Sequence, residues 1–357
     1  MKIALAHDSF TQLGGAERLV DAFHELYPEA PIFTLVLDKN LKEKYKSWDI
    51  RTSWLQVLYN FFPKLQYFLF LIPAAVSSLD FSGYDVVLSS SSVFIKNINV
   101  PKGTLHINYC HTPARFLWSE PDYINDEVPW IIRPLVKLFL TWMRGWDYKG
   151  AQRVDYFIAN SIEVQNRILS VYERTSIVIH PFVDTEFWHP TKQKSDYFLL
   201  AGRLQAHKKS ELVMQIFNDL KIPLHVVGTG RQEGYLQSIA KENISFFGRI
   251  TDEQLRDEYS AAKGIIYPQI EDFGLVPIEA AACGTGTLAY YKGGAVETVL
   301  PGETGELFDS YDKEKIKQDI VDWKPEKYQQ NILRIQAEKF SKEKFKQAIV
   351  SFINESR

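Results

Sequence analysis

Cysteine is scarce in this chain of 357 residues, which contains only Cys110 and Cys283. The two lie far apart and lack the spacing of metal ligands, so they are typical of a protein of the reducing cytoplasm. Strong charge of either sign is also missing, since the formal net charge is -3. This balance argues against nucleic acid as the main partner.

Long hydrophobic runs are missing as well, although 14% of the residues are aromatic. The longest uncharged run in the aromatic segment 54–79 is 65–79, and Pro73 interrupts it. A membrane-spanning helix needs about 20 apolar residues, so no such helix is expected. The N-terminal apolar run is short and ends at His7 and Asp8, which predicts a first strand and no signal peptide.

The most informative stretch is Pro268 to Gly284, PQIEDFGLVPIEAAACG. It follows the buried apolar run 264–267, and Pro277 is well placed to begin a helix that ends near Gly284. We therefore expect a strand, a loop carrying Glu271, and a helix with Glu279 in its first turn. A helix N-terminus attracts anions, so two carboxylates would flank a site that also favours phosphate.

This stretch resembles the Glu-x7-Glu motif of the retaining glycosyltransferases of family 4, which have the GT-B fold. The runs YKGGAVE (291–297) and GETGEL (302–307) are similar to that family too. The resemblance implies that Glu271 faces the donor sugar and is catalytic, and that Glu279 binds the ribose. It further implies that the loop after Glu271 contacts the donor phosphates, which makes donor-binding residues of Asp272, Phe273, Gly274 and Leu275.

Two further motifs follow predicted strands in the first half of the chain. Gly14 and Gly15, in LGGAER, follow the first strand, and the resemblance implies that they meet the donor phosphate. The run YCHTPARFLW places His111 at the end of the predicted strand 105–110. It resembles the family subgroup that includes bacterial mannosyltransferases of polysaccharide and O-antigen assembly, which implies a catalytic-site role for His111.

A second α/β unit is predicted to begin with the strand 196–200, followed by Arg203 and Lys209. Both cations can reach a diphosphate, and Lys208 is an alternative to Lys209. The resemblance implies a phosphate clamp of this kind, and it places the nucleotide base near Arg249 and Ile250. The GTG run 228–230 does not extend to a full GxGxxG, so an NAD site is poorly supported.

The fold class expected is α/β with the GT-B architecture: two Rossmann-like parallel-sheet domains that face a central cleft. We expect an acceptor-binding domain over residues 1–185 and a nucleotide-sugar domain over 186–338. By resemblance, the final helix, 339–357, packs back on the first domain.

The segment 129–153 alternates cations with aromatic residues, among them Trp130 and Trp142. Such a segment suits either an anionic membrane surface or an inter-helix face with solvated cations. The first alternative places the protein in the cytoplasm, peripheral on the inner face of the plasma membrane, where it would meet a saccharide or polyprenyl-linked acceptor.

No metal-binding group and no cofactor are expected, and arginine, lysine and backbone amides would neutralise the leaving diphosphate. By subgroup resemblance the donor is GDP-mannose, with a UDP-hexose as the alternative. A glycoside hydrolase using two carboxylates and a non-catalytic sugar-nucleotide binding protein are the rival functions.

Overall fold

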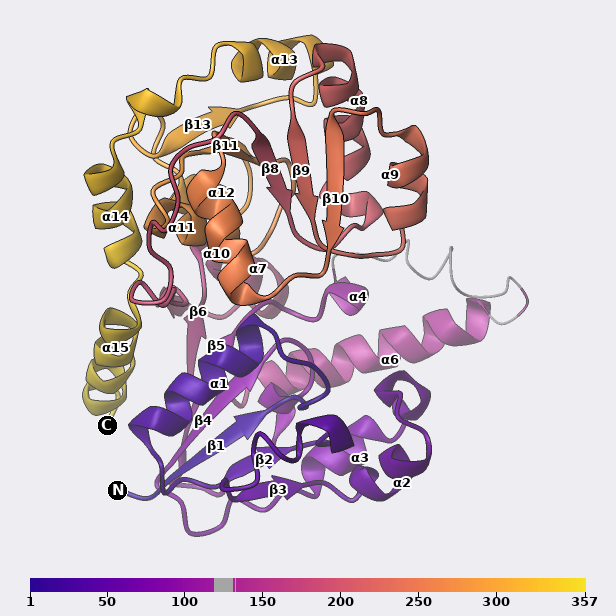
Figure 1. The fold of residues 1–357 in the computed structure, drawn as a ribbon. Coiled ribbons are helices and arrows are strands. Elements are labelled where there is room, and N and C mark those ends of the chain that lie inside the picture. Colours follow the sequence, from indigo (N-terminus) through magenta and orange to yellow (C-terminus); the bar gives the residue numbers. More distant parts are fainter. Residues whose placement is uncertain (119–130, 132) are drawn as a thin grey trace. The chain divides into compact units, whose positions relative to one another are not determined.

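The computed structural model describes residues 1–118, 131 and 133–357 (Figure 1). The chain divides into two compact units, each with its own sheet. The first unit comprises Met1–His180 together with Lys346–Arg357, and the second comprises Pro181–Phe345.

The first unit is built on a seven-stranded parallel sheet with the strand order β3-β2-β1-β4-β5-β6-β7. Its central strands are buried on both faces and consist of short apolar runs, as expected of a parallel sheet covered by helices. The strands are β1 (Ile3–His7), β2 (Ile32–Thr34), β3 (Ile50–Thr52), β4 (Val86–Ser91), β5 (Leu105–Cys110), β6 (Tyr156–Ala159) and β7 (Ser176–Val178).

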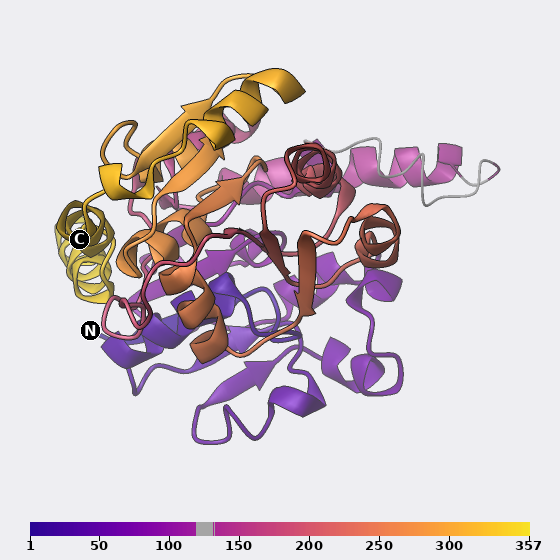
Figure 2. The ribbon, with the colours of Figure 1, turned by 45° about the horizontal axis from the view of Figure 1, so that its top comes forward.

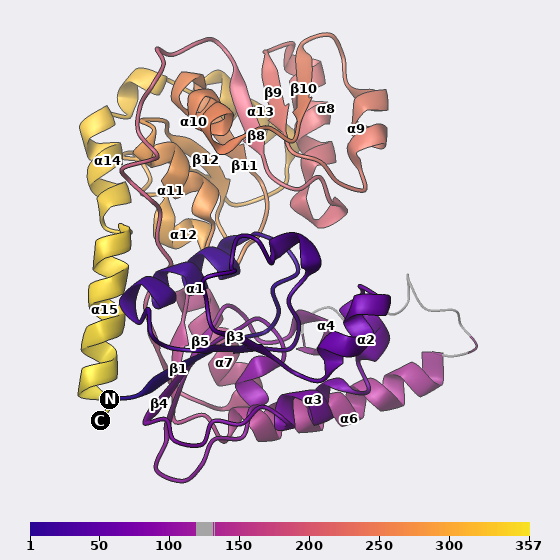
Figure 3. The same ribbon diagram turned by 60° about the horizontal axis from the view of Figure 1, so that its bottom comes forward.

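The longest helix of the first unit, α6, reaches past the strands of its sheet (Figures 2 and 3) and lies beside α2 and α3 (Figures 1 and 3). The α-helices are α1 (Gly15–Leu26), α2 (Leu55–Phe61), α3 (Ile72–Ser77), α4 (Arg115–Trp118), α6 (Arg133–Ala151) and α7 (Ile162–Tyr172). Single 3-10 turns are η1 (Lys39–Leu41), η2 (Leu65–Phe68) and η3 (Ile95–Asn97). No helix among the described residues is both long and apolar enough to cross a membrane.

The second unit has a six-stranded parallel sheet in the order β10-β9-β8-β11-β12-β13. Its strands are β8 (Phe198–Ala201), β9 (Leu224–Val227), β10 (Ile244–Gly248), β11 (Gly264–Tyr267), β12 (Thr287–Tyr290) and β13 (Gly305–Phe308). The sequence predicted the first five of these, with small differences at their ends. β13, which falls in the GETGEL run, was not predicted as a strand.

Right-handed crossovers put α8 and α9 on one face of the second sheet and α10 and α11 on the other, because the strand order reverses after β10 (Figures 1 and 3). The α-helices are α8 (Ser210–Leu220), α9 (Glu233–Ile239), α10 (Asp252–Ala261), α11 (Leu275–Ala282), α12 (Ala295–Thr298), α13 (Lys313–Val321) and α14 (Gln330–Glu338), with 3-10 turns η4 (Ala206–Lys208) and η5 (Pro325–Lys327). The final helix α15 (Lys342–Glu355) begins in the second unit and ends in the first.

Both sheets therefore have the doubly wound α/β topology, which confirms the predicted fold class. In such sheets ligands bind outside the carboxyl ends of the strands, where the order reverses. That point lies between β1 and β4 in the first unit and between β8 and β11 in the second. The loops after these four strands carry Gly14, Ser92, Arg203 and Glu271.

Candidate active site

The loop after β11 brings Glu271 against a cation from the loop after β8. The ammonium of Lys208 donates to Oε1 of Glu271, and Nε2 of Gln269 donates to the same oxygen at 3.4 Å. Burial by itself would raise the pKa of Glu271, but the charge and hydrogen bond of Lys208 outweigh it and hold the pKa below its usual range. Glu271 is therefore a carboxylate at neutral pH, paired with a cation that a bound anion can attract away.

Two glycines of the YKGGAVE run, Gly293 and Gly294, pack against the backbone of the Glu271 loop. The amide of Gly294 donates to the carbonyl oxygen of Glu271 at 2.9 Å. A Cβ atom at Gly294 would lie 2.0 Å from the carbonyl oxygen of Phe273, and one at Gly293 would lie 2.4 Å from that of Glu271. Only glycine allows this close backbone approach, so the run fixes the position of the Glu271 loop.

Helix α11 begins at Leu275, not at Pro277 as predicted, so Glu279 lies in the second turn of the helix and not the first. The reason is Gly274, which adopts a left-handed conformation (φ 87°) at the N-cap and lets the helix start two residues earlier. Pro277 is then the third helical residue, where its missing N–H costs no intrahelical bond.

Glu279 is buried and points into the second unit. Its Oε2 accepts a hydrogen bond from the hydroxyl of Tyr259 on α10 at 3.2 Å. Burial, then the charge of Glu279 and, more weakly, that of Glu271 raise the pKa of Tyr259 well above its ordinary value. Glu279, on the helix that follows the Glu271 loop, therefore contacts a buried hydroxyl within the second unit.

The predicted cations Arg203 and Lys209 are both exposed on the loop after β8. Lys209 lies over the ring of Tyr311 at 5.2 Å from its centroid. The hydroxyl of Tyr311 donates to the carbonyl of Pro268, at the end of β11, at 2.8 Å. Lys209 is therefore near the same edge, but the structure brings Lys208, the alternative, to Glu271.

The remaining predicted donor residues of the second unit lie on two loops. Arg249, exposed, and Ile250, half-buried, follow β10, which is the outer strand of the sheet. Asp272 is half-buried, whereas the ring of Phe273 is buried and packs against Phe340 at 5.5 Å. Only the backbone of Phe273 is thus available to a ligand.

A hollow of about 490 Å³ opens elsewhere on the second unit, beside α10. Tyr197 and Phe247 form part of its wall, and of the predicted site residues only Ile250 lines it. Glu271 and the cations lie outside this hollow, so we do not assign the donor site to it.

In the first unit, Gly14 and His111 lie in loops that follow β1 and β5. Gly14 is the N-cap of α1, which begins at Gly15. His111 follows β5, its amide donates to the carbonyl of Ser91 at 2.8 Å, and its Nε2 is 2.9 Å from Oγ of Ser90. His111 comes directly after β5, as predicted, and its side chain is half-buried.

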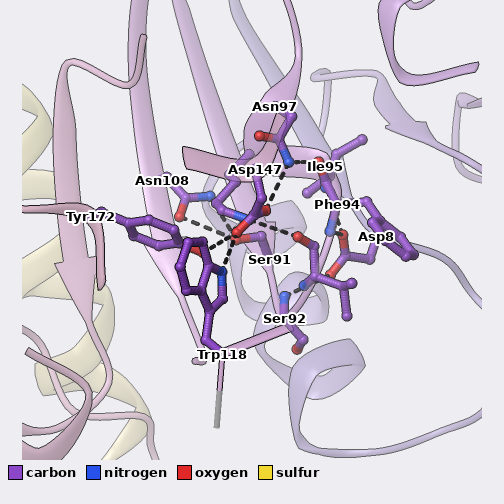
Figure 4. A network of polar contacts seen from close by, with 12 residues as sticks. Asp8, Ser91, Ser92, Phe94, Ile95, Asn97, Asn108, Trp118, Asp147 and Tyr172 are labelled. Carbon is purple, nitrogen blue, oxygen red and sulfur yellow. Dashed lines mark hydrogen bonds and ion pairs between the residues drawn. The ribbon is translucent and has the colours of Figure 1, made fainter. Parts of the chain in front are cut away.

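Sequence reasoning missed Asp8, which follows β1 at the reversal point of the first sheet. Its carboxylate accepts four consecutive backbone N–H bonds, of 2.6 to 2.9 Å, from residues 92–95 (Figure 4). Its position one residue beyond a buried strand was the available signal. Asp8 therefore joins the loop after β4 to the loop after β1.

Lys96, the residue after the segment 92–95, forms a buried ion pair with Asp147, and the two side chains are 1% and 0% exposed. Asp147 also accepts hydrogen bonds from Nε1 of Trp118, the last residue of α4, and from the hydroxyl of Tyr172, the last residue of α7 (Figure 4). This network fixes α6 against the turn that Asp8 holds. Both cysteines are buried, and no group of three metal-binding side chains occurs among the residues that the structure describes.

Comparison with known proteins agrees with this architecture. Residues 183–342 match the family described as glycosyl transferases group 1, and residues 13–187 match glycosyltransferase family 4. HepE of Anabaena, solved in complex with UDP, has 17% identity and a TM-score of 0.71, with 99% of this chain and 100% of that one covered.

Two curated relatives are similar over part of their length. A D-inositol 3-phosphate glycosyltransferase of Catenulispora acidiphila is 30% identical, covering 44% of this chain and 46% of that protein. A GDP-mannose-dependent phosphatidylinositol monomannoside mannosyltransferase of Mycolicibacterium smegmatis is 27% identical, covering 56% and 58%. The chain thus spans about half the length of the curated relatives it matches. The two adjoining family matches, on two doubly wound sheets of GT-B type, show that the chain belongs to the group 1 glycosyl transferases of family 4.

Proposed function

We propose that the protein transfers a hexose from a nucleotide sugar to a saccharide or lipid-linked saccharide acceptor in cell-surface polysaccharide biosynthesis. The observation that carries the proposal is the pairing of Lys208 with Glu271 where the second sheet reverses, just before the helix that carries Glu279. Carboxylates accept from sugar hydroxyls, and a cation beside a helix N-terminus binds a diphosphate. A site with both groups can therefore bind the sugar hydroxyls and the diphosphate of a nucleotide sugar.

In this proposal the diphosphate draws Lys208 away from Glu271. Lys208 and Arg203 then bind the phosphate oxygens, together with amides of the loop 272–275. By the family resemblance, Gly14 and Gly15 would also meet the donor phosphate. The freed Glu271 carboxylate orients the hexose. Because negative charge grows on the departing phosphate, preformed cations stabilise the transition state more than the ground state.

We propose that Glu279 binds the ribose hydroxyls and that the base lies near Arg249 and Ile250. His111 would contact the hexose from the first unit. The reaction would retain the anomeric configuration, with the acceptor attacking on the same face and the departing phosphate accepting its proton. No metal ion has a step in this scheme.

GDP-mannose is the donor we propose, because relatives of this chain are named GDP-mannose-dependent mannosyltransferases. A UDP-hexose is the second candidate, since HepE was solved with UDP and with UDP-glucose. Thermal-shift measurements with GDP, UDP and ADP distinguish the bases, because a ligand at 100 times its dissociation constant adds about 2.7 kcal/mol.

The test of the proposal is the release of nucleoside diphosphate from GDP-mannose and from UDP-glucose, with and without saccharide acceptors. We expect one of the two donors to be turned over, and turnover to persist with a chelator present. Release of free sugar from a polysaccharide without any nucleotide sugar would favour the hydrolase instead. Tight nucleotide-sugar binding without turnover would favour the non-catalytic binding protein.

We also propose that the first unit attaches to an anionic membrane surface through an aromatic face formed by α2, η2, α3 and the first half of α6. Phe70 and Phe139 join the two parts, with ring centroids 3.9 Å apart. Large apolar side chains are 53 to 74% exposed on this face, namely Val57, Phe61, Phe62, Tyr67, Phe70, Leu135, Leu138 and Trp142. The predicted segment also included Pro129 and Trp130, which lie outside the described residues.

Cations near the aromatic face divide into two kinds. Lys64 and Lys137 are exposed, whereas Arg144 and Arg153 donate to the backbone carbonyls of Leu117 and Asn97. The first pair is placed to attract anionic lipid, at about 1 kcal/mol for each cation.

Flotation with liposomes of phosphatidylglycerol and phosphatidylcholine tests the attachment. The wild type should float at low salt, and Phe61→Ser with Leu138→Ser should remain at the bottom. Exposed Tyr235→Ser on α9 is the matched control and should float. A wild-type protein that does not float at low salt contradicts this part of the proposal.

A further inference from the structure

Glu17, in the first turn of α1, uses its two carboxylate oxygens on different partners. Oε2 accepts the amide N–H of Gly14 at 2.8 Å, which is the carboxylate half of a capping box, since glycine has no side chain to supply the other half. Oε1 lies 3.7 Å from Nε2 of His7, the last residue of β1. An ordinary capping-box carboxylate is solvated, but the side chains of Glu17 and His7 are only 6% and 3% exposed.

A buried charge with so few partners is costly, so its retention calls for an explanation beyond capping. Burial by itself would raise the pKa of Glu17, but the neighbouring His7 outweighs it and keeps the pKa below its usual range. The Nε2 atom of His7 has no hydrogen-bond partner among the residues that the structure describes. Glu17 Oε1, at 3.7 Å, is placed to serve it.

His7 continues the connection to the neighbouring strand. Its Nδ1 lies 3.2 Å from the carbonyl oxygen of Ser90, its partner across β1 and β4. Since a carbonyl oxygen only accepts, Nδ1 carries a proton. The hydroxyl of the same Ser90 lies 2.9 Å from Nε2 of His111.

We infer that Glu17, His7 and Ser90 are positioning residues that hold the Gly14–Gly15 turn and His111 in one fixed geometry at the carboxyl edge of the first sheet. This inference rests on the proposed function, in which the turn meets the donor phosphate and His111 meets the hexose. The connection positions and does not relay protons, because it passes through the carbonyl of Ser90, which has no proton to give. Together the contacts span the ends of three adjacent strands, β1, β4 and β5.

The test compares Glu17→Ala, Glu17→Gln and Ser90→Ala in the full-length protein. The readout is kcat and KM for nucleoside diphosphate release from GDP-mannose or UDP-glucose, whichever the wild type turns over, with water as acceptor. Glu17→Ala should raise KM about tenfold, a loss equivalent to about 1.4 kcal/mol. Glu17→Gln should stay within about threefold of the wild type, because its amide oxygen still accepts from Gly14 and its amide N–H can serve His7. Ser90→Ala should lower kcat and leave KM nearly unchanged.

The capping box of α10 provides the matched control. On α10, Oε1 of Gln254 accepts from the amide of Thr251 at 2.9 Å, and Gln254→Ala removes that contact without touching the first unit. This variant should leave both constants unchanged. Equal effects of Glu17→Ala and Gln254→Ala would overturn the inference, since Glu17 would then be a helix cap and no more.

The double variant Glu17→Ala, Ser90→Ala tests the connection itself. Residues that act as a unit are non-additive, so the double variant should lose less kcat/KM than the product of the single losses. Full additivity would overturn the inference.

Hydrogen exchange of the backbone amides of residues 8–15 gives an answer independent of turnover. Ser90→Ala should speed exchange in this segment if the residues are connected, and unchanged exchange would count against the inference. A wild type that releases no nucleoside diphosphate refutes the proposed function, while the exchange measurement still decides the connection.

Discussion

Lys208 and Glu271 form an ion pair across the reversal point of the second sheet, with side chains that are 18% and 29% exposed. Lys208 comes from the loop after β8 and Glu271 from the loop after β11. In the proposed function, this carboxylate holds the cation until a diphosphate binds. When the donor binds, its diphosphate would replace the Glu271 carboxylate as the anion that Lys208 contacts.

The first prediction separates the two neighbouring lysines. Lys208→Ala should weaken GDP or UDP binding about ten- to a hundredfold, because a hydrogen bond to a charged group contributes about 1.5–3 kcal/mol. Lys209→Ala should weaken it by less than about threefold. Lys209 lies over a ring at the surface, a contact that contributes about 0.5–1 kcal/mol, and the variant still has the cation of Lys208. Isothermal titration calorimetry gives both constants, and the reverse order would exclude Lys208 as the phosphate ligand.

A second prediction concerns Glu279 and the ribose. Glu279→Gln should weaken GDP or UDP binding about tenfold and leave the binding of inorganic pyrophosphate unchanged, because pyrophosphate has no ribose. Tyr259→Phe removes the 3.2 Å hydrogen bond to Glu279 and serves as the control for indirect effects. If Glu279→Gln weakened pyrophosphate as much as the nucleotide, Glu279 would not be a ribose ligand.

The third prediction uses the glycine that supports the Glu271 loop. Gly294→Ala would place a Cβ atom 2.0 Å from the carbonyl oxygen of Phe273, so the loop must move. Overpacking of this kind costs about 1–3 kcal/mol of unfolding free energy, and nucleotide affinity should fall with it.

Gly145→Ala is the matched control for that glycine. It lies within α6 with no heavy atom within 4 Å of the added Cβ, and it should gain about 0.5–1 kcal/mol. Urea unfolding measures both variants. A Gly294→Ala protein with wild-type stability and affinity would show that the close approach does not fix the loop.

The fourth prediction concerns acid and the buried His106 on β5. Burial, together with the charge of Arg153, lowers the pKa of His106 to about 3. In the unfolded chain a histidine takes up its proton near pH 6.5. The unfolded state therefore binds one more proton between these values, and the free energy of unfolding should fall by about 1.4 kcal/mol for each pH unit below 6.5.

Urea titrations at pH 7.5, 6.5, 5.5 and 4.5 measure this dependence. His106→Asn cannot titrate, so its stability should fall less steeply over the same range. Parallel slopes for the wild type and the variant would show that His106 is not the group responsible.

The sequence predicted the strands that carry the site, because a buried parallel strand is a short apolar run with a polar residue at its end. Residues 105–110, 224–227 and 264–267 were predicted with the bounds that the structure has. The same reasoning placed Glu271 and Arg203 at strand ends, and the order of the strands then brings their loops together.

Other features depend on geometry that no local pattern contains. The choice between Lys208 and Lys209 depends on the 3-10 turn η4 and on the left-handed conformation of Lys209 (φ 58°), which turn the two side chains apart. The start of α11 depends on the conformation of Gly274, and proline alone indicated a later start. The His7–Glu17 contact joins two elements through a distance that spacing along the chain does not reveal.

The central claim is that Glu271 acts on the bound donor, and Glu271→Gln tests it most directly. We expect this variant to bind GDP or UDP at least as tightly as the wild type, because Lys208 no longer has a carboxylate partner. Release of nucleoside diphosphate from the nucleotide sugar should fall about 10²–10³-fold, the usual effect of removing one preorganised electrostatic group. Undiminished turnover by a Glu271→Gln protein that still binds the donor would contradict the account.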